Sequence, residues 1–245
     1  MSNRQKVLPT WEELKEDLKP MTPKEKLDHL WTYYKGVVFG FLFAVLVVIM
    51  AVSAYINANK EIVVSGMLAN VYMTQEGYNY LTEDYAELLG CEGNQVVELI
   101  ASNFVSLSDP TSAEDNSTAA QKLILQVASG TMDYAIIDNI AIEFYASQDV
   151  FSDLRTIFPA EMIAQWEEQD MLYYIMVVPD GVDLDNMEID PETADRIPIG
   201  IKIQSLPLVQ DTMHGGEYYF CATSHEPDVE VIRGVWDHIL AWEKK

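Results

Sequence analysis

The sequence has few of the residues that build metal sites, disulfide frameworks and common catalytic centres. It contains two cysteines and four histidines in 245 residues, and the histidines do not lie at metal-ligand spacing. A Walker loop, G-x-G-x-x-G, G-x-S-x-G, H-E-x-x-H and C-x-x-C are all absent. We therefore expect a protein that is not an enzyme and that carries no cofactor and no metal, with a hydrolase as the least favoured function.

The cysteines, Cys91 and Cys221, carry no spacing typical of a disulfide framework. An oxidising environment outside the cytoplasm would permit a bridge between them. Two unpaired, buried thiols are the favoured alternative, and the sequence leaves the pairing open.

Basic residues are also scarce, and they are unevenly distributed. The chain has 15 Lys and Arg against 39 Asp and Glu. Residues 1–35 hold seven of the basic and six of the acidic residues, which leaves eight basic and 33 acidic residues after them. A net charge of −25 on that larger part repels nucleic acid and anionic membrane surfaces. We expect no nucleic-acid partner and a well-solvated acidic surface.

One long stretch has no charge at all. Residues 36–59 form a run of 24 uncharged, mostly apolar residues between Lys35 and Lys60. A bilayer core of about 30 Å needs roughly 20 such residues in a helix. The run is too long for the apolar part of a cleaved signal peptide, although Ala51-Val52-Ser53-Ala54 offers small residues for cleavage. An uncleaved signal-anchor is the favoured interpretation.

The basic residues also predict the orientation of this span. Lys and Arg near a span stay on the cytoplasmic side, and residues 1–35 carry most of those that lie close. We expect a single-pass protein of the cell membrane, with residues 1–35 in the cytoplasm as a segment that contains an amphipathic helix. Residues 36–59 would contact the lipid bilayer, and residues 60–245 would form an extracytoplasmic domain.

Capping motifs mark two helix starts in the first part of the chain. Thr10-Trp11-Glu12-Glu13 predicts a short helix over 11–18. Thr22-Pro23-Lys24-Glu25 predicts a second helix, which runs from 23 to about 57 and includes the apolar stretch.

The pattern after residue 60 predicts alternating strands and helices. Strands are expected at 61–71, 96–107, 133–138, 172–178, 197–203 and 218–223, and helices at 74–89, 118–129, 139–146, 159–170 and from 227 on. The strand–helix alternation of the first half is typical of crossovers in a parallel sheet. We predict an α/β domain with a mixed, mostly parallel sheet flanked by helices.

A binding site in such a domain is expected outside the carboxyl ends of the parallel strands. The candidate ligand-binding residues at these ends are Tyr72, Thr74, Ser106, Ser108, Asp138 and Asn139. The alternative for each is ordinary turn and helix-cap chemistry. The acidic segment 180–195 is either a solvated loop or a weak calcium site, because calcium prefers oxygen ligands.

Three segments resemble a known family. Gln121 to Asp138 ends Gly-Thr-Met-Asp-Tyr-Ala-Ile-Ile-Asp, Phe151 to Arg155 reads Phe-Ser-Asp-Leu-Arg, and Tyr218 begins a strand followed by a helix. These segments are similar to parts of type II extracellular (periplasmic-type) solute-binding proteins. The resemblance implies a compact solute-binding-like lobe without catalysis. The segment Lys24 to Lys35 resembles juxtamembrane segments of uncharacterised single-span proteins of Gram-positive bacteria.

Two departures limit what the resemblance carries over. Solute-binding proteins have two lobes and are usually longer than this domain, and many are tethered by a lipidated cysteine that neither Cys91 nor Cys221 matches. Ligand residues of the family are therefore not transferred. The favoured function is a membrane-anchored binding or sensing domain, accessory to a transporter, with a small-molecule ligand of unspecified class. The alternative is a structural or scaffolding subunit with protein partners in a membrane complex.

Overall fold

The computed structural model describes residues 19–103, 113–176, 195–223 and 227–244, together with residues 12, 15 and 16. The chain divides into two compact units, Met1–Asn59 and Lys60–Lys245. The helix predicted over 11–18 lies mostly outside the described residues.

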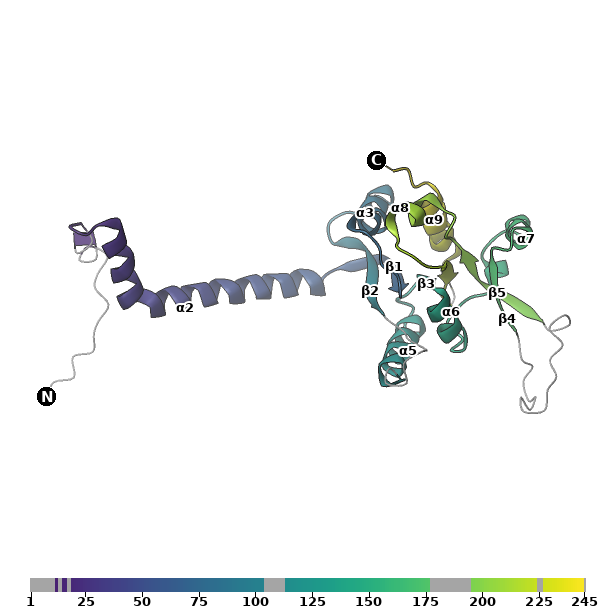
Figure 1. Ribbon diagram of the computed structural model, residues 1–245, viewed down its shortest axis with the longest axis horizontal. Coiled ribbons are helices and arrows are strands. Elements are labelled where there is room, and N and C mark those ends of the chain that lie inside the picture. Colours follow the sequence, from purple (N-terminus) through teal and green to yellow (C-terminus); the bar gives the residue numbers. More distant parts are fainter. Residues whose placement is uncertain are drawn as a thin grey trace. The chain divides into compact units, whose positions relative to one another are not determined.

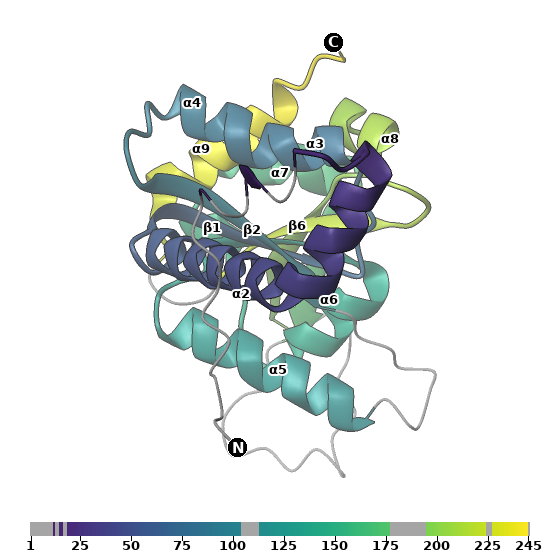
Figure 2. The ribbon, with the colours of Figure 1, turned by 90° about the vertical axis from the view of Figure 1, so that its left-hand side faces the viewer.

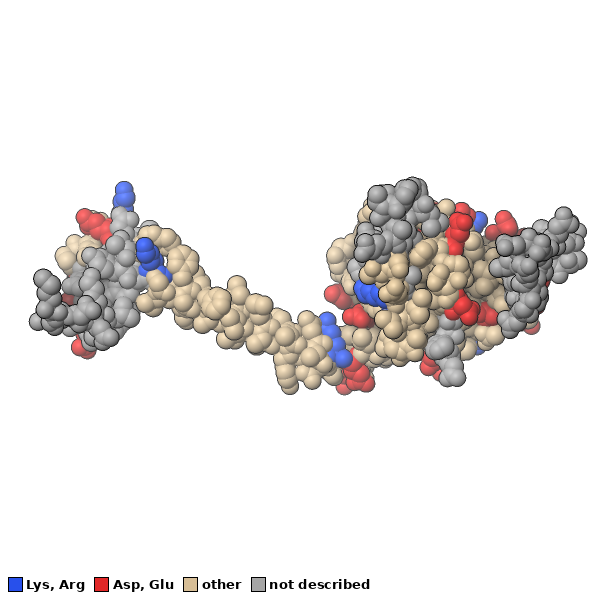
Figure 3. All heavy atoms as spheres, turned by 90° about the horizontal axis from the view of Figure 1, so that it is seen from below, with Lys and Arg blue, Asp and Glu red and all other residues tan. Residues whose placement is uncertain are grey.

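The first unit is dominated by one long helix, α2 (Pro23–Ala58). It begins as predicted, since the Thr22 side chain accepts a hydrogen bond from the Glu25 N–H and the Glu25 carboxylate accepts one from the Thr22 N–H. Its stretch Lys35–Ala58 is apolar and has no buried residue. In Figure 3, the face of this stretch that is turned toward the viewer shows no charged side chain. At 1.5 Å per residue, 24 residues span about 36 Å, so this helix is long enough to cross a membrane and fits a signal anchor or a signal sequence.

The second unit is an α/β domain built on a six-stranded sheet of order β2-β1-β3-β6-β5-β4. The strands are β1 (Glu61–Ala69), β2 (Gln95–Asn103), β3 (Tyr134–Asp138), β4 (Leu172–Met176), β5 (Arg196–Lys202) and β6 (Tyr218–Ala222). Strand β1 pairs in parallel with β2 and β3, whereas the pairs β3–β6, β6–β5 and β5–β4 are antiparallel.

A mixed sheet is therefore confirmed, but its description as mostly parallel is wrong. Parallel neighbours need a crossover connection, and helices supply it only between β1, β2 and β3. The chain from β5 to β6 returns through a short helix and a turn, so these two strands lie next to each other in opposite directions.

Helices cover both faces of the sheet (Figures 1 and 2). One face carries α3 (Gln75–Asn79), a π-helical turn (Tyr80–Asp84), α4 (Tyr85–Leu88), α8 (Pro207–Thr212) and α9 (Val229–Leu240). The other face carries α5 (Ala113–Ala128) and α6 (Asn139–Ala146). Helix α7 (Ala160–Glu168) follows the 3-10 turn Leu154–Thr156.

The core on the α9 face centres on aromatic rings. Trp236 of α9 is 2% exposed, and its ring centroid lies 5.3 Å from that of Trp166 of α7 and 5.4 Å from that of Phe220 of β6. Because these contacts join α7 and α9 to the sheet, the whole domain shares one packed interior on this side.

Two local predictions need correction. The single helix predicted over 74–89 is interrupted by the π-helical turn Tyr80–Asp84. Helix α8 was not predicted, although Pro207 at its start and the buried Leu208 and Val209 are typical of a short helix. Cys91 and Cys221 are both free thiols; Cys221 is buried and Cys91 is only partly buried.

Candidate functional site

The structure brings four of the predicted site residues to one edge of the sheet. Tyr72 and Thr74 follow β1, while Asp138 ends β3 and Asn139 begins α6. The ends of these two strands are joined, because Asn70 Nδ2 donates to Asp138 Oδ1 over 3.1 Å. Ser106 and Ser108 lie outside the described residues.

At this edge the polar side chains cap helices. Asp138 Oδ1 accepts a hydrogen bond from the Ala141 N–H over 2.7 Å and so caps α6. Thr74 Oγ1 accepts from the Gly77 N–H over 3.3 Å and caps α3. The Tyr72 side chain is exposed, and its carbonyl accepts the His214 N–H over 3.2 Å. These contacts stabilise local turns and helix starts.

The opposite edge of the sheet contains a pocket of about 520 Å³, here called the Asp133 pocket. It lies where β3 begins, between the end of α5 and the start of α9. Its lining residues are Ala128, Ser129, Gly130, Met132, Asp133, Pro227 and Asp228.

The carboxylate of Asp133 is held in a fixed position in this pocket. Its Oδ2 accepts a hydrogen bond from the Ser65 N–H over 2.7 Å, and its own N–H donates to the Ser65 carbonyl over 2.9 Å. Burial raises the pKa of Asp133, the hydrogen bond from Ser65 lowers it, and the charge of Asp228 raises it. The pocket therefore holds a half-buried carboxylate that gains from a nearby hydrogen-bond donor or positive charge.

The second carboxylate of the pocket, Asp228, is the N-cap of α9. Its Oδ1 accepts hydrogen bonds from the Glu230 N–H over 3.0 Å and the Val231 N–H over 3.3 Å. A helix N-terminus favours negative charge, which explains why an acid is stable at this position so close to Asp133.

A second pocket of about 520 Å³ lies along the same edge and shares Pro227 with the first. It is here called the Phe151 pocket. Phe151 forms an isolated antiparallel bridge with Thr223, and the Ser152 hydroxyl donates to the Thr223 carbonyl. Its lining residues are Asp149, Phe151, Ser152, Asp153, Thr156, Ile175, Ile197 and Pro227. The wall is more apolar than that of the Asp133 pocket, since it includes Phe151, Ile175 and Ile197.

His238 is a core residue of α9, away from these pockets. It is 7% exposed and stacks on Tyr80 and Tyr85, with ring centroids 4.0 and 4.7 Å apart. Its Nε2 lies 2.9 Å from the Tyr80 carbonyl, and the Tyr80 hydroxyl donates to the His238 carbonyl over 2.7 Å. These contacts satisfy the ring and backbone of His238 inside the core, so it is a structural histidine.

The described part of the chain contains no group of three or more His, Cys, Asp or Glu residues that could hold a metal ion. Of the acidic segment 180–195, only Asp195 belongs to that part, so the calcium alternative lies outside it.

Sequence reasoning missed Asp133 and Asp228 as pocket residues. The prediction considered the carboxyl ends of the parallel strands, but α9 follows an antiparallel strand and begins at the other edge. The signal that could have found Asp228 is its N-cap position after the last strand.

No family model, curated protein or solved structure matches this chain.

Proposed function

We propose that this chain is a single-pass membrane protein whose residues 60–245 form a non-enzymatic binding or sensing domain outside the cytoplasm. The observation that carries the proposal is the Asp133 pocket in a self-contained α/β domain. Convergent polar groups and a carboxyl of shifted pKa in one pocket mark a candidate ligand site.

The long apolar helix supports the membrane anchor. Lys35–Ala58 is free of buried residues, so it has no soluble core to belong to within its own unit. Basic residues at 1–35 and the strongly acidic composition after 60 favour the orientation with the N-terminus in the cytoplasm.

The chemistry of the Asp133 pocket favours a ligand with a hydrogen-bond donor or a positive charge. Asp133 and Asp228 repel each other, and that repulsion is part of what raises the pKa of Asp133. A ligand that donates to Asp133 or carries an ammonium group relieves the repulsion. The resemblance to solute-binding proteins points the same way, by fold analogy, and makes a role beside a transporter the natural setting.

The alternative is a scaffolding subunit that binds another protein of the membrane. The observation that favours it is the exposed apolar surface of α5, where Leu125 is 69% exposed and Ile124 is 37% exposed. Exposed apolar patches mark protein contacts when they are contiguous.

The binding proposal is tested by a thermal-shift screen of the full chain in lipid nanodiscs. The panel contains amines, amino acids, peptides, sugars and nucleobases. A ligand raises the melting temperature by mass action, with a stabilisation of about 2.7 kcal/mol at 100 times its dissociation constant. We expect a dose-dependent rise for the native chain and for Asp170→Asn, whose side chain is exposed and lies outside the pocket. We expect the rise to disappear in Asp133→Asn. A ligand whose effect survives Asp133→Asn places binding elsewhere, and a flat panel favours the scaffold.

The anchor is tested separately in membranes from expressing cells. We expect the chain to resist alkaline carbonate extraction, a C-terminal tag to be accessible to protease added outside, and an N-terminal tag to be protected. Release by carbonate, or the reverse protection pattern, contradicts the proposed topology.

A further inference from the structure

A third pocket, of about 270 Å³, lies between α7 and the strands β4 and β5. It is here called the Arg196 pocket, and it shares no lining residue with the Asp133 pocket. Its lining residues are Arg155, Ile163, Glu167, Tyr174, Arg196 and Pro198. Two guanidinium groups in one pocket are unusual in a domain with so few basic residues.

Among the described residues of this domain, Arg196 is the arginine whose side chain lacks a hydrogen-bond or ion-pair partner. Residues 60–245 contain three arginines, Arg155, Arg196 and Arg233. Arg233 Nε donates to the Ile157 carbonyl over 2.7 Å, and Arg155 pairs with Asp153. Within the described residues, the exposed side chain of Arg196, at the start of β5, makes no hydrogen bond or ion pair. The planar guanidinium of Arg196 therefore has N–H donors available to bind an anion.

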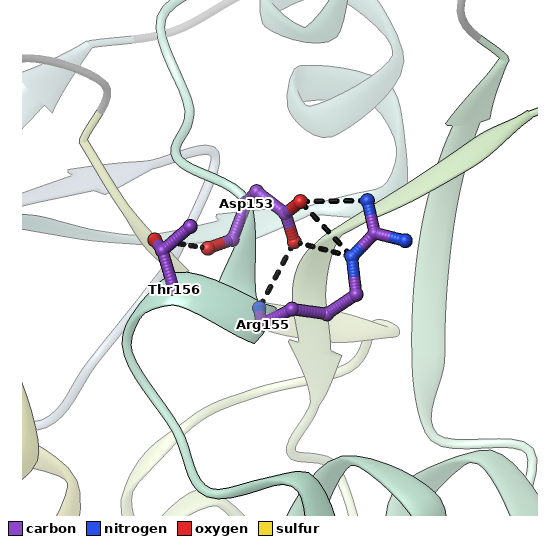
Figure 4. Close-up of polar contacts among 3 residues, drawn as sticks. All are labelled: Asp153, Arg155 and Thr156. Atoms are coloured by element: carbon purple, nitrogen blue, oxygen red, sulfur yellow. Dashed lines mark hydrogen bonds and ion pairs between the residues drawn. The ribbon is translucent and has the colours of Figure 1, made fainter.

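The neighbouring guanidinium of Arg155 is fixed by a two-point contact (Figure 4). Its Nε lies 2.9 Å from both carboxylate oxygens of Asp153, and its Nη2 lies 2.7 Å from Oδ2. The Arg155 N–H also donates to Asp153 Oδ1 over 2.9 Å, at the start of the 3-10 turn. The charge of Arg155 is thereby compensated, while its remaining Nη1 group takes no part in the contacts with Asp153.

Tyr174 adds a phenol to the pocket. Its hydroxyl donates to Glu167 Oε1 over 3.1 Å. Burial, together with the bond to Glu167, raises the pKa of Tyr174 to about 12, so the hydroxyl stays protonated at neutral pH. Arg155 and Arg196 line the same pocket as Tyr174, and their positive charges lower the pKa of the phenol.

We propose that the Arg196 pocket binds a small organic monocarboxylate, with the Arg196 guanidinium on the carboxylate and the side chains of Ile163 and Pro198 against the apolar part. A planar carboxylate matches the two parallel donors of a guanidinium. Arg155 is compensated by Asp153, so within the described residues Arg196 supplies the one positive charge of the pocket that no carboxylate holds in an ion pair, and the Glu167 carboxylate faces the same space. A phosphate with about −1.5 to −2 charge would exceed that. The volume of about 270 Å³ suits a ligand smaller than those of typical pockets, which span about 300–1,000 Å³.

This site is separate from the Asp133 pocket and does not depend on the proposed function. It would give the domain two binding sites of opposite charge preference.

The test is isothermal titration of the full chain in phosphatidylcholine nanodiscs with sodium benzoate, at constant ionic strength set by sodium chloride. Inorganic phosphate is titrated in parallel. We expect benzoate to bind at millimolar concentration or tighter, and to bind about tenfold more weakly to Arg196→Gln, because the charge-assisted pair is lost. Arg196→Lys keeps the positive charge but loses the two parallel N–H donors of the guanidinium. Its affinity for benzoate should therefore lie between those of the native chain and Arg196→Gln.

Two further variants distinguish specific binding of the carboxylate by Arg196 from nonspecific attraction to positive charge. Lys202→Gln removes one positive charge from the same strand, where Lys202 pairs with Glu217, and it should leave benzoate binding unchanged. Glu167→Gln keeps an acceptor for Tyr174 and removes a negative charge from the pocket, so it should tighten benzoate binding. The proposal is overturned by an absence of benzoate heat in the folded native chain, by an equal loss in Lys202→Gln and Arg196→Gln, or by phosphate binding more tightly than benzoate.

Discussion

The two edges of the β-sheet place similar polar residues in different surroundings. Where β1 and β3 end, the side-chain oxygens of Asp138 and Thr74 accept hydrogen bonds from backbone N–H groups in the first turns of α6 and α3. Where β3 begins, Asp133 is held by the Ser65 backbone and faces a pocket of about 520 Å³. An aspartate beside a strand is thus a cap at one edge and a pocket wall at the other.

The direction of β6 explains the difference. Because β6 is antiparallel to β3, its carboxyl end lies at the edge where β3 begins, and α9 starts there with Asp228 as its cap. The expectation that sites form outside the carboxyl ends of strands still applies, but the strand that matters is β6. The space between the end of α5 and the start of α9 becomes the Asp133 pocket.

Both edges of the sheet share the aromatic core around Trp236, and we expect the domain to unfold as one cooperative unit. Trp236→Ala removes the ring that contacts Trp166 and Phe220. We expect a loss of about 3–5 kcal/mol in the free energy of unfolding, from the lost transfer free energy and the cavity. Urea unfolding followed by fluorescence and by circular dichroism should give coincident transitions.

A conservative variant provides the control. Trp236 Nε1 is buried without a hydrogen-bond partner in the described part of the chain, so Trp236→Phe removes an unsatisfied donor and keeps most of the packing. We expect it to lose much less stability than Trp236→Ala. Two separate transitions in either variant would show that the edges unfold independently.

Much of the fold could be predicted because it depends on local patterns. The capping box at Thr22 and Glu25 predicted the start of α2, and the helices predicted at 139–146 and from 227 on agree with α6 and α9 to within two residues. The helix predicted at 118–129 is α5, which begins five residues earlier, at Ala113. These features are encoded by neighbours in the sequence, so no knowledge of the distant contacts is needed.

The strand order and the pockets depend on contacts far apart in the sequence. That β6 lies between β3 and β5 follows from packing across more than 80 residues. The Asp133 pocket needs α5 and α9 to meet, and the Arg196 pocket needs Arg155 and Arg196 to meet across about 40 residues of chain. Local periodicity holds no information about such long-range contacts, so the sequence pattern did not predict the Arg196 pocket.

A smaller change in the free energy of unfolding tests the edge of the sheet where β1 and β3 end and the polar side chains cap helices. Asp138→Ala removes the cap of α6 and the partner of Asn70. We expect a loss of about 0.5–2 kcal/mol in the free energy of unfolding, the range for loss of an N-cap, measured by urea unfolding. Asp138→Asn, which keeps a capping oxygen, should lose less. If Asp138→Ala abolished binding of a ligand found in the screen while stability stayed the same, the predicted site at this edge would regain support.

The smallest predicted effect, a change in the pH dependence of stability, tests the edge of the sheet that holds the Asp133 pocket. The pKa of Asp133 is raised in the folded state, above its ordinary value of 3.8, because the carboxyl is partly buried. The folded state therefore binds more protons than the unfolded state at mildly acidic pH, and the contribution of Asp133 to stability falls as pH rises through this range. Asp133→Asn has no such titration, so its melting temperature relative to the native chain should improve between pH 4 and neutrality. The Asp170→Asn control, with an exposed carboxylate, should follow the native chain. A parallel dependence in native chain and Asp133→Asn would mean that Asp133 is as well solvated as a surface acid, and the contrast between the two edges would fail.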